Sequence, residues 1–96
     1  MTTIDVTCEP TRDGWSCRVR VSDVDGSSEH RIGVARADLE RLAPAETTPE
    51  DLVRRSFRFL LEREPRASIL RSFDLPVIGR YFPDWEAHIG RGTGGG

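Results

Sequence analysis

Two cysteines and two histidines are the side chains of this chain best suited to bind a metal, and their spacing limits what they can do. Cys8, Cys17, His30 and His88 are its only soft-metal ligands. Zinc sites usually draw such ligands in close pairs along the chain, whereas Cys8 and Cys17 lie nine positions apart. On the strand pattern described below, His30 lies about 13 Å along the sheet from the position that faces Cys17. We therefore predict no metal site and no cofactor.

The serines and glycines form no pattern typical of catalysis or of nucleotide binding. Ser56, Ser68 and Ser72 lack the glycine frame of a nucleophile elbow, and neither histidine has an evident acidic partner in the sequence. Phosphate-cradling loops are rich in glycine, and the only glycine run is the terminal stretch 90–96. We therefore expect no enzymatic activity.

All 14 basic residues are arginine, and three of them fall on the outer face of a predicted sheet. These are Arg18, Arg20 and Arg31, and the predicted pairing places Arg20 opposite Arg31. Like charges in facing positions are unfavourable, which suggests a bound phosphate. The same face carries three acids: Asp5, Glu9 and Glu29. A charge-compensated, solvated face is therefore the favoured interpretation.

The alternative function that the arginines suggest is a small nucleic-acid-associated regulator. Its candidate phosphate contacts are Arg18, Arg20, Arg31, Arg71 and Arg80. The segment 67–83 can be interpreted as a helix-turn-helix with a recognition helix at 75–82, but that helix is mostly apolar and only Arg80 is free to meet phosphate. The net charge of −2 gives no general attraction to nucleic acid. DNA binding is therefore the less favoured function.

Three aromatic residues, Tyr81, Phe82 and Trp85, lie within five positions near the end of the chain. One interpretation is that they close the core over the central helix. The other is that part of the cluster stays exposed and anchors a protein partner, since exposed aromatic groups mark partner sites. The sequence leaves both open.

The element that must position these side chains is a helix predicted over Pro49–Glu64. Thr48 suits its N-cap, Pro49 its first position, and Pro65 disfavours helix beyond Glu64. At about 100° per residue its apolar side chains cover roughly 200° of its girth, wider than the stripe of a helix buried on one side. We therefore expect this helix to be covered from two sides.

Alternating apolar residues before this helix predict three strands that form an antiparallel meander. The apolar sets are Ile4, Val6 and Cys8, then Trp15, Cys17, Val19 and Val21, then His30, Ile32 and Val34. A turn at Asp25-Gly26 predicts that Val21 faces His30 and Cys17 faces Val34. For the first hairpin two registers keep the apolar face. A loop over 11–14 places Cys8 opposite Cys17, where oxidation could join them, and a turn at 13–14 does not.

The remaining segments predict short helices and a tail. We expect a turn or two of helix over 37–42, a short helix over 68–73, and another over 75–82 capped by Asp74. Asp84 is expected to cap a last turn that contains Trp85 and Ile89. The glycine-rich stretch 90–96 is expected to be disordered, which leaves 1–89 as a single small domain.

The expected location is the cytoplasm. No apolar run approaches the roughly 18 residues of a membrane span, and MTTIDVTCEP has no basic region followed by a long apolar core. In that compartment the two cysteines are expected to be thiols.

The stretch SFRFLLEREP at 56–65, followed by SILRSFDLPVIGRYFPDWE at 68–86, resembles a family of short uncharacterised bacterial proteins. The WSCRVRV strand and the VARADLERLAP connection are similar to that group as well. The resemblance covers most of the chain and implies a shared fold. It implies no activity and no functional residue.

The sequence as a whole predicts an α+β fold, a three-stranded antiparallel β-meander packed on a central amphipathic helix and followed by short C-terminal helices. The predicted function is a non-enzymatic cytoplasmic domain that acts by protein–protein contact, with a partner protein or as a homodimer. At 96 residues the core is small, which favours self-association.

Overall fold

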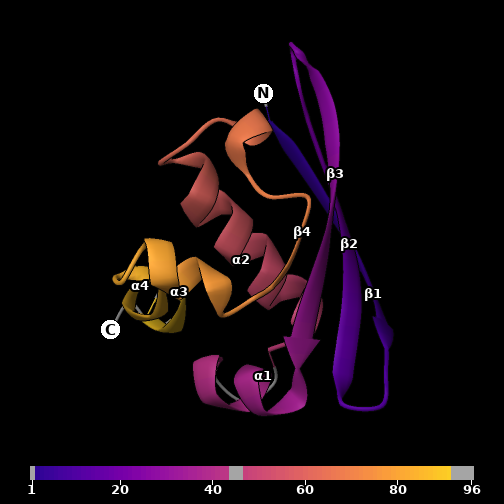
Figure 1. Cartoon of the computed structure of the whole chain (residues 1–96), viewed down its shortest axis with the longest axis vertical. Helices are drawn as coiled ribbons and strands as arrows, with labels where there is room; N and C mark the ends of the chain where they lie inside the picture. Colours follow the sequence, from indigo (N-terminus) through magenta and orange to yellow (C-terminus); the bar gives the residue numbers. More distant parts are fainter. Residues whose placement is uncertain (1, 44–46, 92–96) are drawn as a thin grey trace.

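A four-stranded sheet with helices gathered on one side of it forms the protein (Figure 1). The computed structural model describes residues 2–43 and 47–91. The strands are β1 (Thr3–Pro10), β2 (Gly14–Asp23), β3 (Gly26–Ala35) and β4 (Ser72–Asp74), in that order across the sheet. The helices are α1 (Arg36–Leu42), α2 (Pro49–Leu61), α3 (Val77–Tyr81) and α4 (Trp85–Arg91), with a 3-10 turn η1 (Arg66–Ser68). The predicted α+β class is confirmed.

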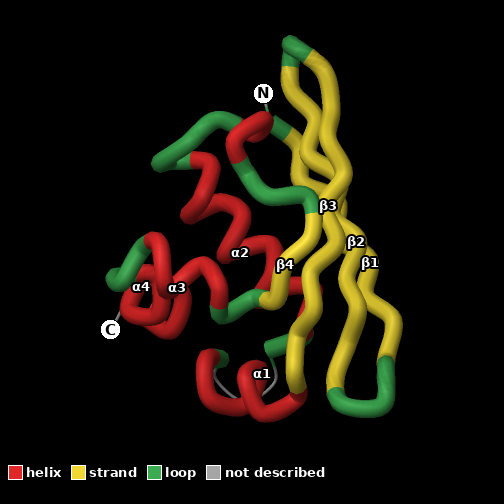
Figure 2. The backbone as a smooth tube through the Cα atoms, viewed as in Figure 1, coloured by secondary structure: helices red, strands yellow, loops and turns green. Residues whose placement is uncertain are grey.

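The first three strands form the predicted antiparallel meander, with one apolar face turned toward α2 (Figure 2). The alternation works as predicted, since Val19, Val21 and Ile32 are fully buried while Arg18 and Arg20 between them are exposed. The face that carries the exposed residues is called the outer face below.

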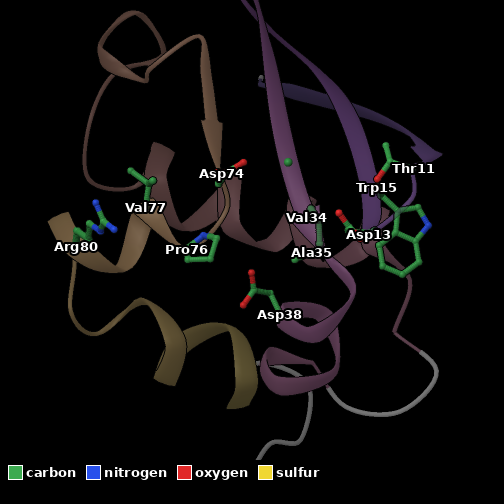
Figure 3. Close-up of a pocket in the computed structure, with 12 residues that line it drawn as sticks. Thr11, Asp13, Trp15, Val34, Ala35, Asp38, Asp74, Pro76, Val77 and Arg80 are labelled. Atoms are coloured by element: carbon green, nitrogen blue, oxygen red, sulfur yellow. The ribbon is translucent and has the colours of Figure 1, made fainter.

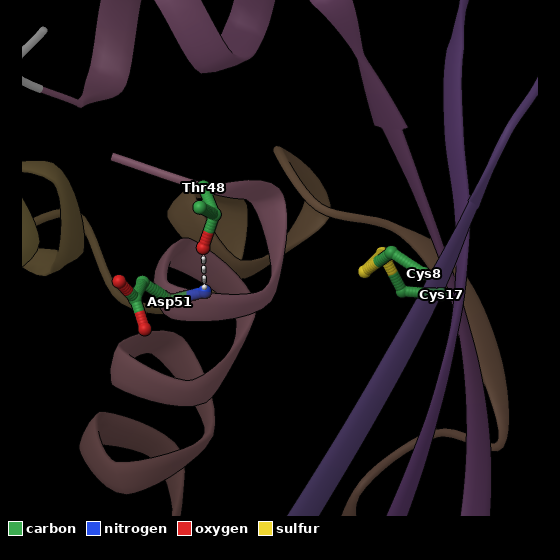
Figure 4. The surroundings of a disulfide bond; sticks show 4 residues. All are labelled: Cys8, Cys17, Thr48 and Asp51. Atoms are coloured by element: carbon green, nitrogen blue, oxygen red, sulfur yellow. Dashed lines mark hydrogen bonds between the residues drawn. A yellow bond between two sulfur atoms is a disulfide. The ribbon is translucent and has the colours of Figure 1, made fainter. Parts of the chain in front are cut away.

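The first hairpin has the longer of its two predicted loops, so that Cys8 pairs with Cys17. The two cysteines form a disulfide bond on the inner side of the sheet (Figure 4). The prediction that they are thiols is therefore wrong for this structure. The loop is closed by a hydrogen bond of 2.7 Å in which the Thr11 amide donates to the Gly14 carbonyl.

The second hairpin turns one residue earlier than predicted, which shifts the strand pairing by two positions. Asp23 pairs with Gly26, so that Val24 and Asp25 form the turn and Val19, rather than Val21, faces His30. The Asp25 amide donates to the Asp23 carboxylate at 2.8 Å, and Gly26 takes a φ of 142° that other residues rarely adopt. A shift by two positions keeps every apolar side chain on the same face, which is why the pattern did not reveal it.

The central helix begins as predicted and ends earlier. Thr48 Oγ1 accepts a hydrogen bond of 3.1 Å from the Asp51 amide, which caps α2 (Figure 4). The helix ends at Leu61 rather than Glu64, because the amides of Arg63 and Glu64 both donate to the Leu60 carbonyl. Its buried residues are Leu52, Val53, Ser56, Phe57, Phe59 and Leu60. Contacts with the sheet on one side and with α4 on the other cover α2 from two sides, as its wide apolar arc required.

The helix predicted over 68–73 is wrong, because this segment forms η1 and then β4, which pairs with β3 in parallel. The Arg31 amide donates to the Arg71 carbonyl at 2.7 Å, and the Leu75 amide donates to the Gly33 carbonyl at 2.9 Å. Phe73 meets Phe57 of α2 with ring centroids 6.4 Å apart. Pairing with a strand forty residues away therefore overrides the local helical preference.

The C-terminal helices are placed nearly as predicted, with shifted ends. α3 starts at Val77 after Pro76, so Asp74 lies in β4 and is not its cap. Gly90 and Arg91 belong to α4, so the tail prediction is wrong for these two residues, and 92–96 lie outside the described residues. No helix within the described ranges is long and apolar enough to cross a membrane.

Candidate functional site

Trp85, one of the three predicted interface anchors, belongs to the core. It is fully buried, and its Nε1–H donates a hydrogen bond of 3.1 Å to the hydroxyl of Ser56 on α2. Ser56 in turn donates to the Leu52 carbonyl at 2.9 Å. The interface prediction is therefore wrong for Trp85. The signal in the sequence was Ser56, a lone hydroxyl within the apolar arc of α2, which needed a buried polar partner.

The other two aromatic residues lie closer to the surface. Phe82 is half-buried, with its ring edge against Phe59 at a centroid distance of 5.7 Å. Tyr81 is 68% exposed, which is unusual for so large a side chain in a small domain. Of the predicted cluster, Tyr81 alone is presented fully to solvent.

Tyr81 borders an apolar groove of about 340 Å³ between the end of α2, the segment 68–73 and α3. Leu60 and Ile69 are buried in it, while Leu70 is 50% exposed on its border. The lining residues used below are Leu60, Glu64, Ile69, Leu70, Tyr81 and Phe82. Among the described residues of the lining, Glu64 is the one with a charged side chain. These residues are called the apolar groove from here on.

His30 is buried and holds the sheet to the segment before β4. Its Nδ1 lies 2.8 Å from the Leu70 carbonyl, and its Nε2 lies 2.8 Å from the Ser28 hydroxyl. Because a carbonyl only accepts, Nδ1 carries the proton and donates to Leu70. His30 is therefore buried on the apolar face, as the alternation of this strand predicts, and Leu70 bonds to its ring. Within 2–43 and 47–91, no three His, Cys, Asp or Glu residues gather as metal ligands.

A cavity of about 450 Å³ opens between the first hairpin loop, α1 and α3 (Figure 3). Asp13 and Asp38 point toward it in Figure 3, and internal contacts engage two of its lining side chains, Asp38 and Trp15. Asp38 pairs with Arg41 at 3.3 Å, and the guanidinium of Arg36 lies 5.1 Å from the centre of the Trp15 ring. These contacts hold α1 beside the first hairpin, and the charged side chains of Asp13, Asp74 and Arg80 also line the cavity.

The five arginines of the nucleic-acid hypothesis do not gather on one surface. The true register places Arg18, not Arg20, directly opposite Arg31 on the outer face. Arg71 lies before β4, and Arg80 lies on α3 beside the cavity of Figure 3. Only Arg18 and Arg31 are therefore brought into direct opposition.

One ion pair fixes the far end of the sheet. Arg66 of η1 binds Asp23 at the β2–β3 turn through Nε and Nη2, at 3.1 and 3.4 Å. The hydrogen bond from Arg66 lowers the pKa of Asp23, and the bond from the Asp25 amide lowers it further. The pair ties the hairpin to the segment that leads into β4, so it has a structural role.

Comparison of the chain with models of known families, with curated proteins and with solved structures finds no match. The resemblance to short bacterial proteins therefore stays a prediction. Any function must be argued from the geometry described above.

Proposed function

We propose that the chain is a non-enzymatic protein-interaction domain whose apolar groove binds an apolar segment of a partner protein. One observation carries the proposal. Three large apolar side chains are exposed among the described residues, namely Val24, Leu70 and Tyr81, and two of them border the groove. Exposed apolar surface next to a groove is typical of a partner site, and tyrosine is enriched among the residues that contribute most of the binding free energy.

The size and chemistry of the groove favour a short segment over a small metabolite. Its volume of about 340 Å³ is at the lower end of ligand pockets. Leu60 and Ile69 supply an apolar floor, which suits large aliphatic or aromatic side chains. Glu64 supplies a carboxylate at the border. The partner segment is therefore expected to carry large apolar residues with an arginine or lysine beside them.

The same lining supports a non-catalytic role. Acid–base or nucleophilic chemistry needs two or more reactive groups held within hydrogen-bond reach of one another. Among the described residues of the groove, Glu64 is the single titratable carboxylate, and Tyr81 points its ring to solvent. The groove therefore offers surface to bind rather than groups to react.

The alternative of a nucleic-acid-associated regulator has weaker support. Arg18 and Arg31 oppose each other, but Arg71 and Arg80 lie on other elements and the outer face also carries acids. A duplex needs a continuous basic surface. The predicted cytoplasmic location also stays a prediction, and the Cys8–Cys17 disulfide weighs against it, because disulfides are rare in reducing compartments.

The experiment that tests the proposal is selection from a displayed library of short random peptides with the oxidised chain as bait. Selected peptides are expected to share large apolar residues and a basic residue. Their affinity should fall about 10-fold or more for Tyr81→Ser and for Leu70→Ser, since truncating a central interface side chain commonly costs more than 1 kcal/mol.

Val24→Ser is the matched control, because Val24 is 90% exposed at the hairpin tip and does not line the groove. An equal loss of affinity in Val24→Ser, or no enriched peptide at all, contradicts the proposal. Sedimentation equilibrium on the same proteins decides self-association. A wild-type dimer that Tyr81→Ser turns into a folded monomer identifies a second copy as the occupant of the groove.

A further inference from the structure

A second feature lies on the outer face of the sheet, on the side away from α2. Strand pairing places four residues side by side in one row across all four strands, Thr7, Arg18, Arg31 and Ser72. Arg18 and Arg31 are in directly facing positions, where like charges destabilise a sheet. Within 2–43 and 47–91, neither guanidinium makes an ion pair with an acid. The row is called the arginine row below.

The third arginine of this face has different neighbours. Arg20 lies between Asp5 on β1 and Glu29 on β3, both in facing positions. Neither acid forms an ion pair with Arg20 within 2–43 and 47–91, but both face it directly in its own row. Arg18 and Arg31 have no acid in their row, and the nearest carboxylates lie in the two neighbouring rows.

A hollow lies directly beside the pair. The next row consists of Glu9, Ser16, Gly33 and Asp74, whose two central members are small. A cavity of about 340 Å³ is lined by Thr7, Glu9, Ser16, Arg18 and Arg31, and another of about 360 Å³ by Ser16, Arg31, Gly33, Ser72 and Asp74. They share Ser16 and Arg31, so the two cavities adjoin along the arginine row and are together called the hollow.

Gly33 makes room for the Asp74 carboxylate at one end of the hollow. A Cβ at this position would lie 2.5 Å from Oδ1 of Asp74, closer than real contacts allow. The Asp74 carboxylate thus folds over the glycine and faces the hollow from β4. The resulting site has Arg18 and Arg31 along one side and the hydroxyls of Ser16 and Ser72 beside them. The carboxylates of Glu9 and Asp74 lie at its two ends.

We propose that this hollow binds a small phosphomonoester, with Arg18 and Arg31 on the phosphate and the hydroxylated body of the ligand over Ser16, between Glu9 and Asp74. A phosphomonoester carries about −1.5 to −2 charges at pH 7 and three acceptor oxygens, which matches two planar guanidinium groups. The Ser16 and Ser72 hydroxyls donate to the remaining phosphate oxygens. Glu9 and Asp74 accept hydrogen bonds from ligand hydroxyls at the two ends.

The acids around the pair select a single phosphate over a polyanion. Rows of the sheet are about 7 Å apart, so carboxylates flank the arginine row within one row on both sides. Duplex DNA carries one charge per about 1.7 Å of its axis, and its phosphates would therefore meet these carboxylates. A ligand with one charged group and neutral hydroxyls avoids that repulsion.

The test is isothermal titration calorimetry of the oxidised chain with ribose 5-phosphate and with inorganic phosphate, at constant ionic strength. Ribose 5-phosphate is expected to bind more tightly than phosphate, because its hydroxyls reach Asp74 or Glu9. Arg18→Gln and Arg31→Gln should each weaken binding about 10-fold or more, since hydrogen bonds to charged groups are the stronger class. Arg20→Gln, the matched control on the same face, should change it less than about 2-fold.

Thermal unfolding supplies an independent readout. Without ligand, Arg18→Gln removes the opposition to Arg31 and should raise the unfolding midpoint by about 1–4 °C. With ribose 5-phosphate, the midpoint should rise for wild type and for Arg20→Gln but not for Arg18→Gln.

Three results would overturn the inference. The first is equal weakening by Arg20→Gln, which indicates attraction by general charge. The second is unchanged binding in both Arg18→Gln and Arg31→Gln. The third is tighter binding of a short DNA duplex than of ribose 5-phosphate at the same ionic strength, which would favour the nucleic-acid function instead. Because Tyr81 lies on α3 and lines neither cavity of the hollow, Tyr81→Ser should leave phosphate binding unchanged.

Discussion

The buried hydrogen bond between Trp85 and Ser56 supports a quantitative prediction about what holds α4 to α2. Ser56→Ala removes the acceptor and leaves the Trp85 N–H buried without a partner, at a cost of about 1–3 kcal/mol. Alanine forms helix better than serine, which offsets about 0.5 kcal/mol of this loss. We therefore expect a net loss of about 1–2 kcal/mol in the free energy of unfolding, or about 5–15 °C in the midpoint for a domain of this size.

The same bond predicts that the two positions are strongly coupled. Trp85→Phe removes the donor and some buried volume, and should cost about 1–3 kcal/mol. In the Trp85→Phe background no buried N–H depends on Ser56, so adding Ser56→Ala should change the free energy of unfolding very little. The coupling free energy is therefore expected to be about 1–2 kcal/mol.

The assay is urea unfolding of four oxidised proteins: wild type, Ser56→Ala, Trp85→Phe and the double variant. Unfolding is monitored by far-ultraviolet circular dichroism, because Trp85→Phe alters the fluorescence. Ser27→Ala, which removes an exposed hydroxyl from β3, is the control and should change stability by less than about 0.5 kcal/mol. If the two substitutions add to within about 0.5 kcal/mol, the bond does not couple the helices and the reasoning is wrong.

Two further predictions concern the tethers of the hairpins. Reduction of the Cys8–Cys17 disulfide, which closes a loop with a sequence separation of 9, should lower the free energy of unfolding by about 2–3 kcal/mol, and equal urea midpoints for the oxidised and reduced chains would contradict this. The hydrogen bond from Arg66 lowers the pKa of Asp23, so the stability it adds is fully present above the ordinary carboxyl pKa near 4 and is lost as the pH falls through the lowered pKa. The difference in urea midpoint between wild type and Asp23→Asn should therefore be constant from about pH 5 to pH 7 and shrink as the pH falls below about 4, and a difference that persists undiminished in acid would show that the ion pair is not its source.

The sequence by itself determined the elements whose signals are local. Period-two alternation placed three strands and their buried face, and Thr48 with Pro49 placed the start of α2. These signals are reliable because each depends on neighbouring residues, a side chain every second position or an oxygen beside an amide. The exposed outer face and its arginines followed from the same alternation.

Only the tertiary structure decided which residues face one another and what covers them. A strand that slips by two keeps its apolar face, so the pairing of Arg18 with Arg31 could not be read from the pattern. β4 is three residues long, too short to show a period, and it forms because β3 offers free amides and carbonyls at its edge. The segment before that strand bonds to the buried His30 through Leu70, and the fold places Trp85 of α4 against Ser56. The groove and the hollow both depend on such distant contacts, whose free energy exists only once the chain has folded.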